Sequence, residues 1–298
     1  MARKHTQWQD DVLKLFDAGP HAAMTDRQLR SFLVRHWPDI HAPQSLTEGR
    51  VIQFLLENTK AARVDIVPEP SAKSVKGQLY RSKPRYVWPD TTPFSVALSL
   101  RANSYFTHAT AVFLLGLSQE LPGTIYVNCE QSPKPSPVLA SQGAIDQAFK
   151  ANPRVSKYAY SFMDSRIVLL SGKHTGRLEV SEVRYINGEF YPVTKVERTL
   201  IDCVVRPTYA GGIFHVRDIF ANAKDRVSAN VLAVTLRKLG YVYPYHQAIG
   251  FIMERTGYPS NQFERLRDLG LNYDFYLAHR MAETKYDASW RIHYPSGF

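Results

Sequence analysis

Apolar residues recur at helical spacing in three short segments near the start of the chain. The first segment covers residues 7–17, and its spacing predicts an amphipathic helix. Thr25 with Gln28 and Ser45 with Glu48 fit capping boxes, in which a hydroxyl oxygen accepts from a free backbone N–H and the longer side chain reaches back. We therefore predict three short helices. The apolar stripe of the third consists of Val51, Ile52, Leu55 and Leu56.

The third predicted helix has a polar side, and a basic ribbon follows it. Its polar residues are Thr47, Arg50, Gln53, Glu57 and Asn58. Two β-prone segments come next, 63–67 and 79–88, and no acidic residue lies between Glu69 and Asp90. The basic residues there are Lys73, Lys76, Arg81, Lys83 and Arg85. A short helix followed by a basic ribbon is typical of a winged helix-turn-helix that binds double-stranded DNA, which we expect over residues 1–90.

Helical and strand-like patterns alternate through the rest of the chain. Thr107 is expected to cap a helix, Asn187-Gly188 predicts a hairpin, and Thr194 with Glu197 fits a further capping box. The expected helices include 109–117, 145–149, 194–206, 214–223, 228–239, 243–256 and 260–269, and the expected strands are 123–128, 158–162, 166–170, 183–186, 190–193 and 290–294. The predicted fold class is α+β: an N-terminal winged helix-turn-helix followed by a larger mixed α/β domain over residues 91–298.

Composition supports a folded protein, and its positive charge favours a polyanionic partner, with solubility alone as the alternative. The 298 residues are 44% hydrophobic and carry a formal net charge of +10, with a pI near 9.5. Cys129 and Cys203 have no metal-type spacing, so we expect reduced thiols in a cytoplasmic protein. The start of the chain lacks the apolar run of a signal peptide, and the longest apolar run, 111–117, is too short to cross a bilayer.

Signatures of catalysis are missing from the sequence. There is no phosphate-binding glycine loop, no nucleophile elbow, and no pair of histidines with zinc-type spacing among the ten histidines. We therefore expect no cofactor, no metal and no enzymatic activity, although modification of a partner protein stays open.

Three segments together resemble a known family. They are Tyr105–Leu117, Thr194–Gly212, and Asn272–His279 followed by Tyr286–Pro295. The chain resembles the AbiEi family of antitoxins and transcriptional regulators over almost its whole length, most closely in its middle and C-terminal parts. The resemblance implies an N-terminal winged helix-turn-helix that represses its own promoter and a C-terminal domain that counteracts a nucleotidyltransferase toxin of the AbiEii type, often in abortive defence against phage. The chain lacks the Gly-Ser and paired aspartates that such a toxin needs, so it resembles the antitoxin.

Each candidate residue has a structural alternative. Arg50 and Gln53 suit guanine and adenine edges, and the ribbon cations suit phosphates, but all could be ordinary surface residues. In the C-terminal domain the candidates for toxin contact or a functional core are His108, Arg198, Asp202 and Arg206. Arg198 and Asp202 are neighbours four residues apart on a helix, and Arg206 suits the helix end. Two rival functions also stay open: a stand-alone winged-helix regulator, and an enzyme that modifies the toxin.

Overall fold

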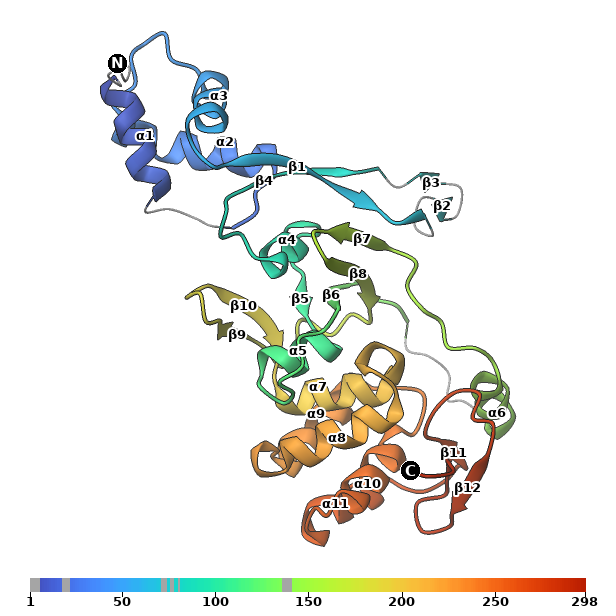
Figure 1. The fold of residues 1–298 in the computed structure, drawn as a ribbon. Coiled ribbons are helices and arrows are strands. Elements are labelled where there is room, and N and C mark those ends of the chain that lie inside the picture. Colours follow the sequence, from blue (N-terminus) through green and yellow to red (C-terminus); the bar gives the residue numbers. More distant parts are fainter. Residues whose placement is uncertain (1–5, 18–21, 71–73, 76–77, 80, 136–140) are drawn as a thin grey trace. The chain divides into compact units, whose positions relative to one another are not determined.

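The computed structural model describes residues 6–17, 22–70, 74–75, 78–79, 81–135 and 141–298 (Figure 1). The chain is mixed α+β, with helices at its N-terminal end. It divides into two compact units, Met1–Ala102 with Lys157–Ile167 (unit 1) and Asn103–Ser156 with Val168–Phe298 (unit 2). This division differs from the segments 1–90 and 91–298 expected from the sequence, because residues 91–102 and 157–167 group with the N-terminal helices.

Unit 1 begins with the three expected helices. They are α1 (Gln7–Asp17), α2 (Asp26–Arg35) and α3 (Glu48–Asn58), with the short 3-10 helix η1 (Trp37–Ile40) between the last two. The capping box of Thr25 and Gln28 at α2 is confirmed. At α3 the predicted box is wrong, because the cap is Thr47, whose hydroxyl accepts from the Arg50 N–H at 3.4 Å. Leu46 is buried just before it, so the chain enters the helix two residues later than Ser45 suggested.

The apolar stripes of these helices form one core. Val12, Leu29, Leu33 and Val51 are almost completely buried in it, and Phe16 stacks on the Trp88 ring with centroids 5.6 Å apart. Burial of this kind is the main stabilising contribution for helices of only ten or eleven residues, which are marginal in isolation.

A β-ribbon follows the helices of unit 1. Strand β1 (Ala62–Pro68) pairs antiparallel with β4 (Lys83–Val87) and on its other side with β7 (Ala159–Phe162), which leads into β8 (Ser165–Gly172). The two short strands β2 (Ser74–Val75) and β3 (Gln78–Leu79) form a separate hairpin. Helix α4 (Pro93–Ser99), capped by Thr92, completes the unit.

Unit 2 contains a mixed sheet. Its strand order is the end of β8, then β6 (Thr124–Glu130), β5 (Tyr105–Phe106), β10 (Phe190–Thr194) and β9 (Val180–Arg184). Strands β10 and β5 run parallel, whereas β5 with β6 and β10 with β9 are antiparallel. The hairpin predicted at Asn187-Gly188 is confirmed, since it joins β9 to β10.

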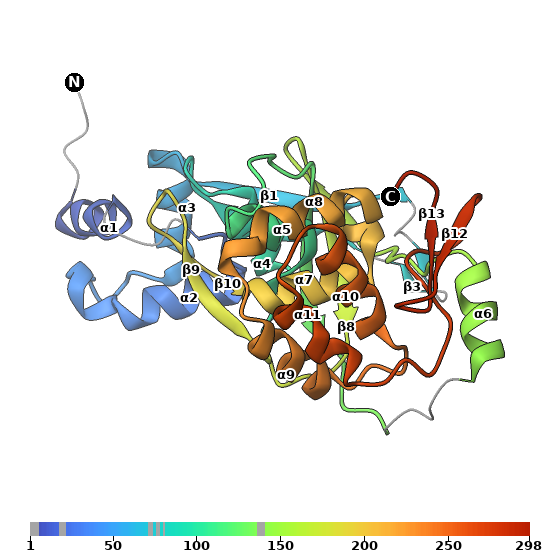
Figure 2. The same cartoon turned by 90° about the horizontal axis from the view of Figure 1, so that it is seen from below.

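Helices make up most of the remainder of unit 2, and Figure 2 shows α7 to α11 gathered together. The helical elements are α5 (His108–Leu114), α6 (Gln142–Lys150), α7 (Val196–Val205), η3 (Pro207–Ala210), α8 (Ile213–Ala223), η4 (Lys224–Arg226), α9 (Ala229–Leu239), α10 (Tyr245–Arg255) and α11 (Ser260–Arg267). A small sheet of β11 (Phe275–Tyr276), β13 (Ile292–Pro295) and β12 (Thr284–Asp287) ends the chain.

The capping box predicted at the start of α7 is wrong. The backbone cap is Lys195, without a side-chain capping bond. The Thr194 hydroxyl lies 2.7 Å from that of Thr199, and the Glu197 carboxylate accepts from the Ser228 N–H at 2.8 Å. Helix α7 is buried on almost every side, so its polar side chains bond to distant segments instead of to its own first turn.

Candidate nucleic-acid interface and a buried polar network

Helix α3 is amphipathic in the way the sequence predicts. Its apolar face, with Val51 and Leu55, is buried in the core of unit 1. The residues of its polar face are exposed, namely Thr47, Arg50, Gln53, Glu57 and Asn58. The helix therefore presents polar side chains to solvent while its other side is fixed by packing.

The exposed residues of α3 differ in how much they are already bonded. Gln53 donates to the Glu57 carboxylate at 2.8 Å, and Asn58 donates to the Phe54 carbonyl at 3.0 Å. Thr47 uses its hydroxyl as the helix cap. Arg50 has no side-chain partner within the described part of the chain, so its guanidinium is available to a ligand.

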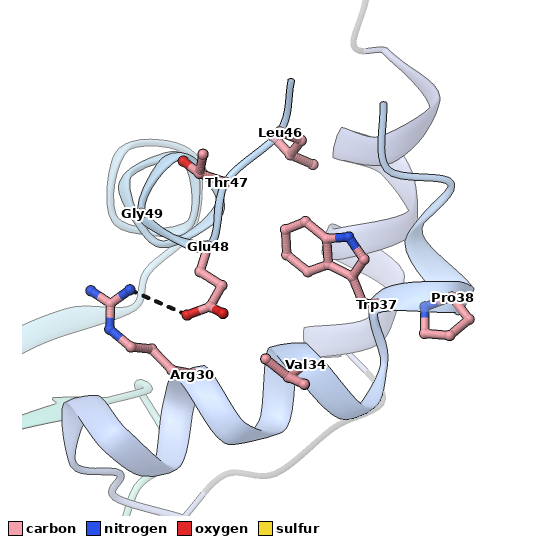
Figure 3. Close-up of a pocket in the computed structure, with 8 residues that line it drawn as sticks. All are labelled: Arg30, Val34, Trp37, Pro38, Leu46, Thr47, Glu48 and Gly49. Atoms are coloured by element: carbon pink, nitrogen blue, oxygen red, sulfur yellow. Dashed lines mark hydrogen bonds and ion pairs between the residues drawn. The ribbon is translucent and has the colours of Figure 1, made fainter. Parts of the chain in front are cut away.

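A groove of about 670 Å³ lies beside the first turn of α3 (Figure 3). Its lining residues are Arg30, Val34, Trp37, Pro38, Leu46, Thr47, Glu48 and Gly49. An ion pair between Arg30 and Glu48, 3.3 Å apart, connects α2 to the start of α3 across this groove. Arg30 also pairs with Asp26 at 2.8 Å, so its charge is compensated on both sides.

Only some of the basic residues predicted in the ribbon are placed where they can contact a phosphate. Arg81 is exposed, and Lys73 and Lys76 lie outside the described residues. Arg85 is a correction: it is 6% exposed and donates to the Ser99 hydroxyl at 2.9 Å and the Ser99 carbonyl at 2.7 Å. Lys83 is half-buried and donates to the Leu100 carbonyl at 3.4 Å.

The end of α4 explains these two corrections. Its last turn leaves backbone carbonyls without helical partners, and Lys83 and Arg85 on one face of β4 satisfy them. Burial, followed by the neighbouring positive charges, lowers the pKa of Lys83, and burial lowers that of Arg85. Both side chains therefore hold α4 against the ribbon.

Sequence reasoning missed other cations of unit 1. Four further basic side chains of unit 1 are exposed and form no ion pair with any residue that the structure describes: Arg27, Arg35, Lys60 and Arg63. Arg63 could have been found from alternation along β1, where Ile66 points inward and is fully buried. Together with Arg50 and Arg81 they are exposed cations of this unit that a polyanion could reach.

Unit 2 holds a buried ion pair between two of the predicted candidates. Arg198 and Asp202 pair at 2.9 Å with side chains only 5% and 7% exposed, so the pair is in the interior and not on the helix surface as expected. Arg198 also donates to the Leu178 carbonyl at 3.0 Å. Burial alone would lower the pKa of Arg198, but Asp202 raises it, so the guanidinium stays charged.

Thr107 completes this pair from another element. Its side chain does not cap α5, contrary to the sequence prediction, but donates to the second Asp202 oxygen at 2.9 Å. Each carboxylate oxygen of Asp202 therefore has a donor, one from Arg198 and one from Thr107. Helix α7 is thus fastened to the start of α5 by a satisfied polar contact.

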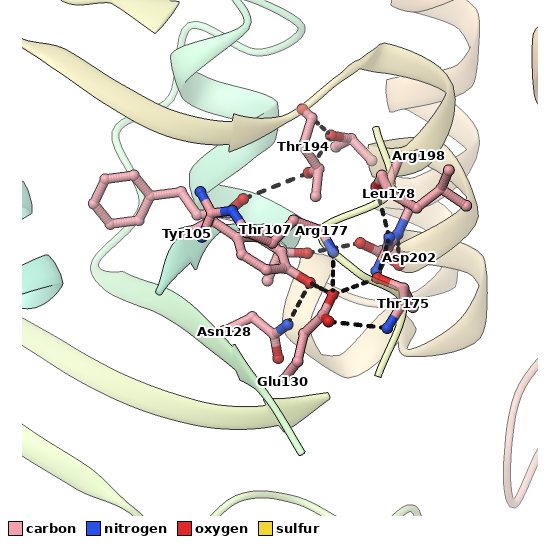
Figure 4. A network of polar contacts seen from close by, with 12 residues as sticks. Tyr105, Thr107, Asn128, Glu130, Thr175, Arg177, Leu178, Thr194, Arg198 and Asp202 are labelled. Carbon is pink, nitrogen blue, oxygen red and sulfur yellow. Dashed lines mark hydrogen bonds and ion pairs between the residues drawn. The ribbon is translucent and has the colours of Figure 1, made fainter. Parts of the chain in front are cut away.

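Glu130 forms the centre of a second group of contacts, drawn with the first in Figure 4. Its carboxylate accepts from the backbone N–H groups of Thr175, Gly176 and Arg177 at 2.9, 3.0 and 3.1 Å, and from the Tyr105 hydroxyl at 3.1 Å. Burial raises the pKa of Glu130, but the hydrogen bonds from Thr175 and Arg177 outweigh it and hold the pKa below its usual value. The ionised carboxylate thereby orders the loop between β8 and β9.

His108 is packed but only partly hydrogen-bonded. Its side chain is buried against Tyr209 with ring centroids 5.3 Å apart, and its Nδ1 atom has no hydrogen-bond partner within the described chain. Burial lowers its pKa to about 4, so the ring is neutral near pH 7. Arg206 lies half-buried at the end of α7, where its N–H donates to the Asp202 carbonyl at 3.0 Å.

Within the residues that the structure describes, no group of three or more His, Cys, Asp or Glu side chains could hold a metal ion. In the same residues, no helix combines the length and apolarity needed to span a bilayer. The structure thus brings three of the four predicted unit 2 candidates, Arg198, Asp202 and His108, to the junction of α5 and α7, and it places Arg206 at the end of α7.

Comparison with known proteins gives a likeness of fold. No family model matches the chain, and no curated protein matches it in sequence. Among solved structures, the fold is similar to the crystal structure of the RV2827C protein from Mycobacterium tuberculosis, with a TM-score of 0.55 and 13% sequence identity. The match covers 98% of this chain and 92% of that chain. At this identity the similarity shows a shared fold.

Proposed function

We propose that this chain is a DNA-binding transcription regulator and antitoxin of the AbiEi type. In this proposal α1 to α3 with the β1–β4 ribbon act as a winged helix-turn-helix on the chain's own promoter. The observation that carries the proposal is the amphipathic α3, whose buried side fixes it in unit 1 while Arg50 and Gln53 stand exposed on the other side. The sequence resemblance to the AbiEi family supports the same assignment, and the fold likeness to the RV2827C protein is of the fold alone.

The proposed contacts divide into two kinds. Arg50 has no side-chain partner among the residues that the structure describes, and we assign it to base edges or phosphate. Gln53 can reach adenine once it leaves Glu57. Arg63 and Arg81 are assigned to phosphates, which position a protein without reading sequence. We do not assign Lys83 and Arg85 to DNA contacts, because their side-chain donors bond to carbonyl groups at the end of α4.

Unit 2 is proposed to counteract a nucleotidyltransferase toxin, directly or through a shared target. The saturated contacts of Asp202 and Glu130 favour a structural role for the Arg198 pair over catalysis, so we propose that the chain is not an enzyme. A chain that modifies its toxin is the alternative, and mass spectrometry of the toxin before and after incubation with this chain distinguishes the two.

The DNA-binding proposal is tested by titrating promoter DNA with variants at several salt concentrations. Arg50→Ala and Arg81→Ala should each weaken binding, and each lost phosphate contact should reduce the slope of log affinity against log salt by about 0.9. Lys238→Ala on α9 is the matched control, because Lys238 is also an exposed cation but belongs to unit 2. If both variants keep the wild-type slope of log affinity against log salt, then α3 and the ribbon do not contact the DNA backbone through these side chains.

The antitoxin proposal is tested by growth rescue. Cells that express the neighbouring toxin should grow when they also express the full chain, and Arg50→Ala should leave this rescue intact because it alters only unit 1. Failure of the full chain to restore growth would contradict the antitoxin assignment while leaving the DNA-binding result untouched.

A further inference from the structure

Strand β9 has a free outer edge in the described part of the chain, since it pairs only with β10. The Tyr185 N–H donates to the Glu189 carbonyl at 2.8 Å, which marks a hydrogen-bonded pair, and the pairing continues at Val183 with Tyr191. Because hydrogen-bonded and non-bonded pairs alternate in an antiparallel ladder, the odd-numbered residues of β9 bond to β10. The backbone N–H and C=O groups of Glu182 and Arg184 therefore point to the free edge, whereas the Val180 N–H donates to the Arg177 carbonyl at 3.1 Å.

The side chains at this edge are unusually exposed for a strand. The side chains of Glu182 and Arg184 are exposed and form no hydrogen bond or ion pair with any residue that the structure describes. At the hairpin end, the Ile186 side chain is 92% exposed and Phe190 of β10 is 62% exposed. Glu182 and Arg184 lie on one face of the strand, because side chains alternate, and Ile186 lies in the turn that follows it.

We propose that β9 pairs antiparallel with β9 of a second copy of this chain, across a two-fold axis at Val183. In this register Glu182 of each copy lies opposite Arg184 of the other copy, so two ion pairs form. The backbone groups of these residues face the free edge, so they can also form the hydrogen bonds between the two strands. Centring the axis on Glu182 or on Arg184 instead places like charges opposite one another, which is destabilising. Charge complementarity thus selects one register and one partner.

The same register places the exposed isoleucine against another apolar residue. Ile186 lies in the turn that follows β9, and in this register it comes close to Val180 of the other copy; this contact also occurs twice, because a two-fold interface repeats every contact. Many edge strands avoid pairing by carrying charges that repel a second copy. In β9, Glu182 and Arg184 favour pairing instead, because two antiparallel copies of the strand place opposite charges next to each other.

The size of the contact predicts a weak dimer. Two short strands and their hairpin ends bury an area at the low end of the known range, below about 1,200 Å² in total. The dimer should therefore dissociate on dilution, and sedimentation velocity over about a hundredfold range of protein concentration should show the shift from monomer to dimer.

Charge reversal tests the register directly in the full-length chain. Glu182→Arg alone places Arg opposite Arg, and Arg184→Glu alone places Glu opposite Glu, so each variant should associate about tenfold more weakly or worse. An equimolar mixture of the two variants restores both opposite-charge pairs and should form heterodimers. The double variant E182R/R184E should dimerise like the wild type, and Lys238→Glu on α9 is the control for an equal change of charge elsewhere.

A cysteine at the axis gives a second readout. Val183 faces its own copy as a non-bonded pair with Cα atoms about 4.5 Å apart, within the disulfide range of about 4.4–6.8 Å. Val183→Cys should therefore form a covalent dimer on mild oxidation, above the background of the wild type and of Arg184→Cys. A wild type that stays monomeric throughout, a dimer that persists in both single charge variants, or a mixture that fails to associate would overturn the proposal.

Discussion

Replacing Asp202 by alanine should destabilise unit 2 strongly, whereas the same replacement of Asp26 should not destabilise unit 1 to a comparable degree. Both aspartates pair with an arginine four residues away, at 2.9 Å for Arg198 and 2.8 Å for Arg30. The pairs differ in burial: the side chains of the first are 5% and 7% exposed, and those of the second are 44% and 56% exposed.

The expected size follows from this difference in burial. Removing Asp202 leaves a buried guanidinium without its counter-charge and Thr107 without its acceptor, which costs about 3–5 kcal/mol of unfolding free energy. At the Asp26 pair, water replaces the lost partner and the change should be close to the error of the measurement. Removing both charges with Arg198→Met and Asp202→Leu should recover much of the loss, since a buried pair and an apolar pair of similar volume are often comparable in stability.

Urea unfolding followed by circular dichroism measures these differences, and hydrogen exchange at α7 reports the change locally. A loss in Asp202→Ala no larger than in Asp26→Ala would refute the claim that burial controls the contribution of this pair. Equal instability of the single variant and the double Met/Leu variant would show that the shape of the site, and not its charge, limits stability.

Three further predictions concern packing and pH in unit 2. Burial lowers the pKa of His108 to about 4, so as the pH falls the unfolded chain binds this proton before the folded chain does. The free energy of unfolding should therefore fall by about 3 kcal/mol between pH 6.5 and pH 4. His108→Asn should flatten this dependence when unfolding is measured across the pH range. Gly250→Ala should cost about 1–3 kcal/mol because a Cβ would lie 2.1 Å from the buried Trp290 ring, whereas Gly143→Ala in α6, with open space, should stabilise slightly in thermal unfolding. Glu130→Gln should raise hydrogen exchange at residues 175–177, because a neutral amide accepts their N–H bonds more weakly; unchanged exchange would contradict the ordering role of the carboxylate.

Local signals in the sequence predicted the elements well where the decisive contacts are also local. The capping box of Thr25 and Gln28 and the hairpin at Asn187-Gly188 both depend on residues within a few positions of each other, and both are confirmed. The amphipathic character of α3 was also predicted, because its stripe follows from helical spacing alone.

The failures came from contacts between distant segments. Arg85 lies in a basic stretch, but its acceptors are at Ser99 on α4, which sequence spacing does not reveal. Glu197 has the spacing of a capping residue, yet it bonds to the Ser228 N–H, 31 positions further on. The Arg198 pair was predicted by spacing, while its burial depends on how α7 packs in unit 2.

The most direct test of the central claim is the ratio of affinities for the chain's own promoter and for a random duplex of equal length, measured by fluorescence anisotropy at one physiological salt concentration. We expect binding to the promoter to be tighter by about a thousandfold or more, and Arg50→Ala should reduce this preference. Equal affinity for the two duplexes would contradict sequence-specific recognition by α3.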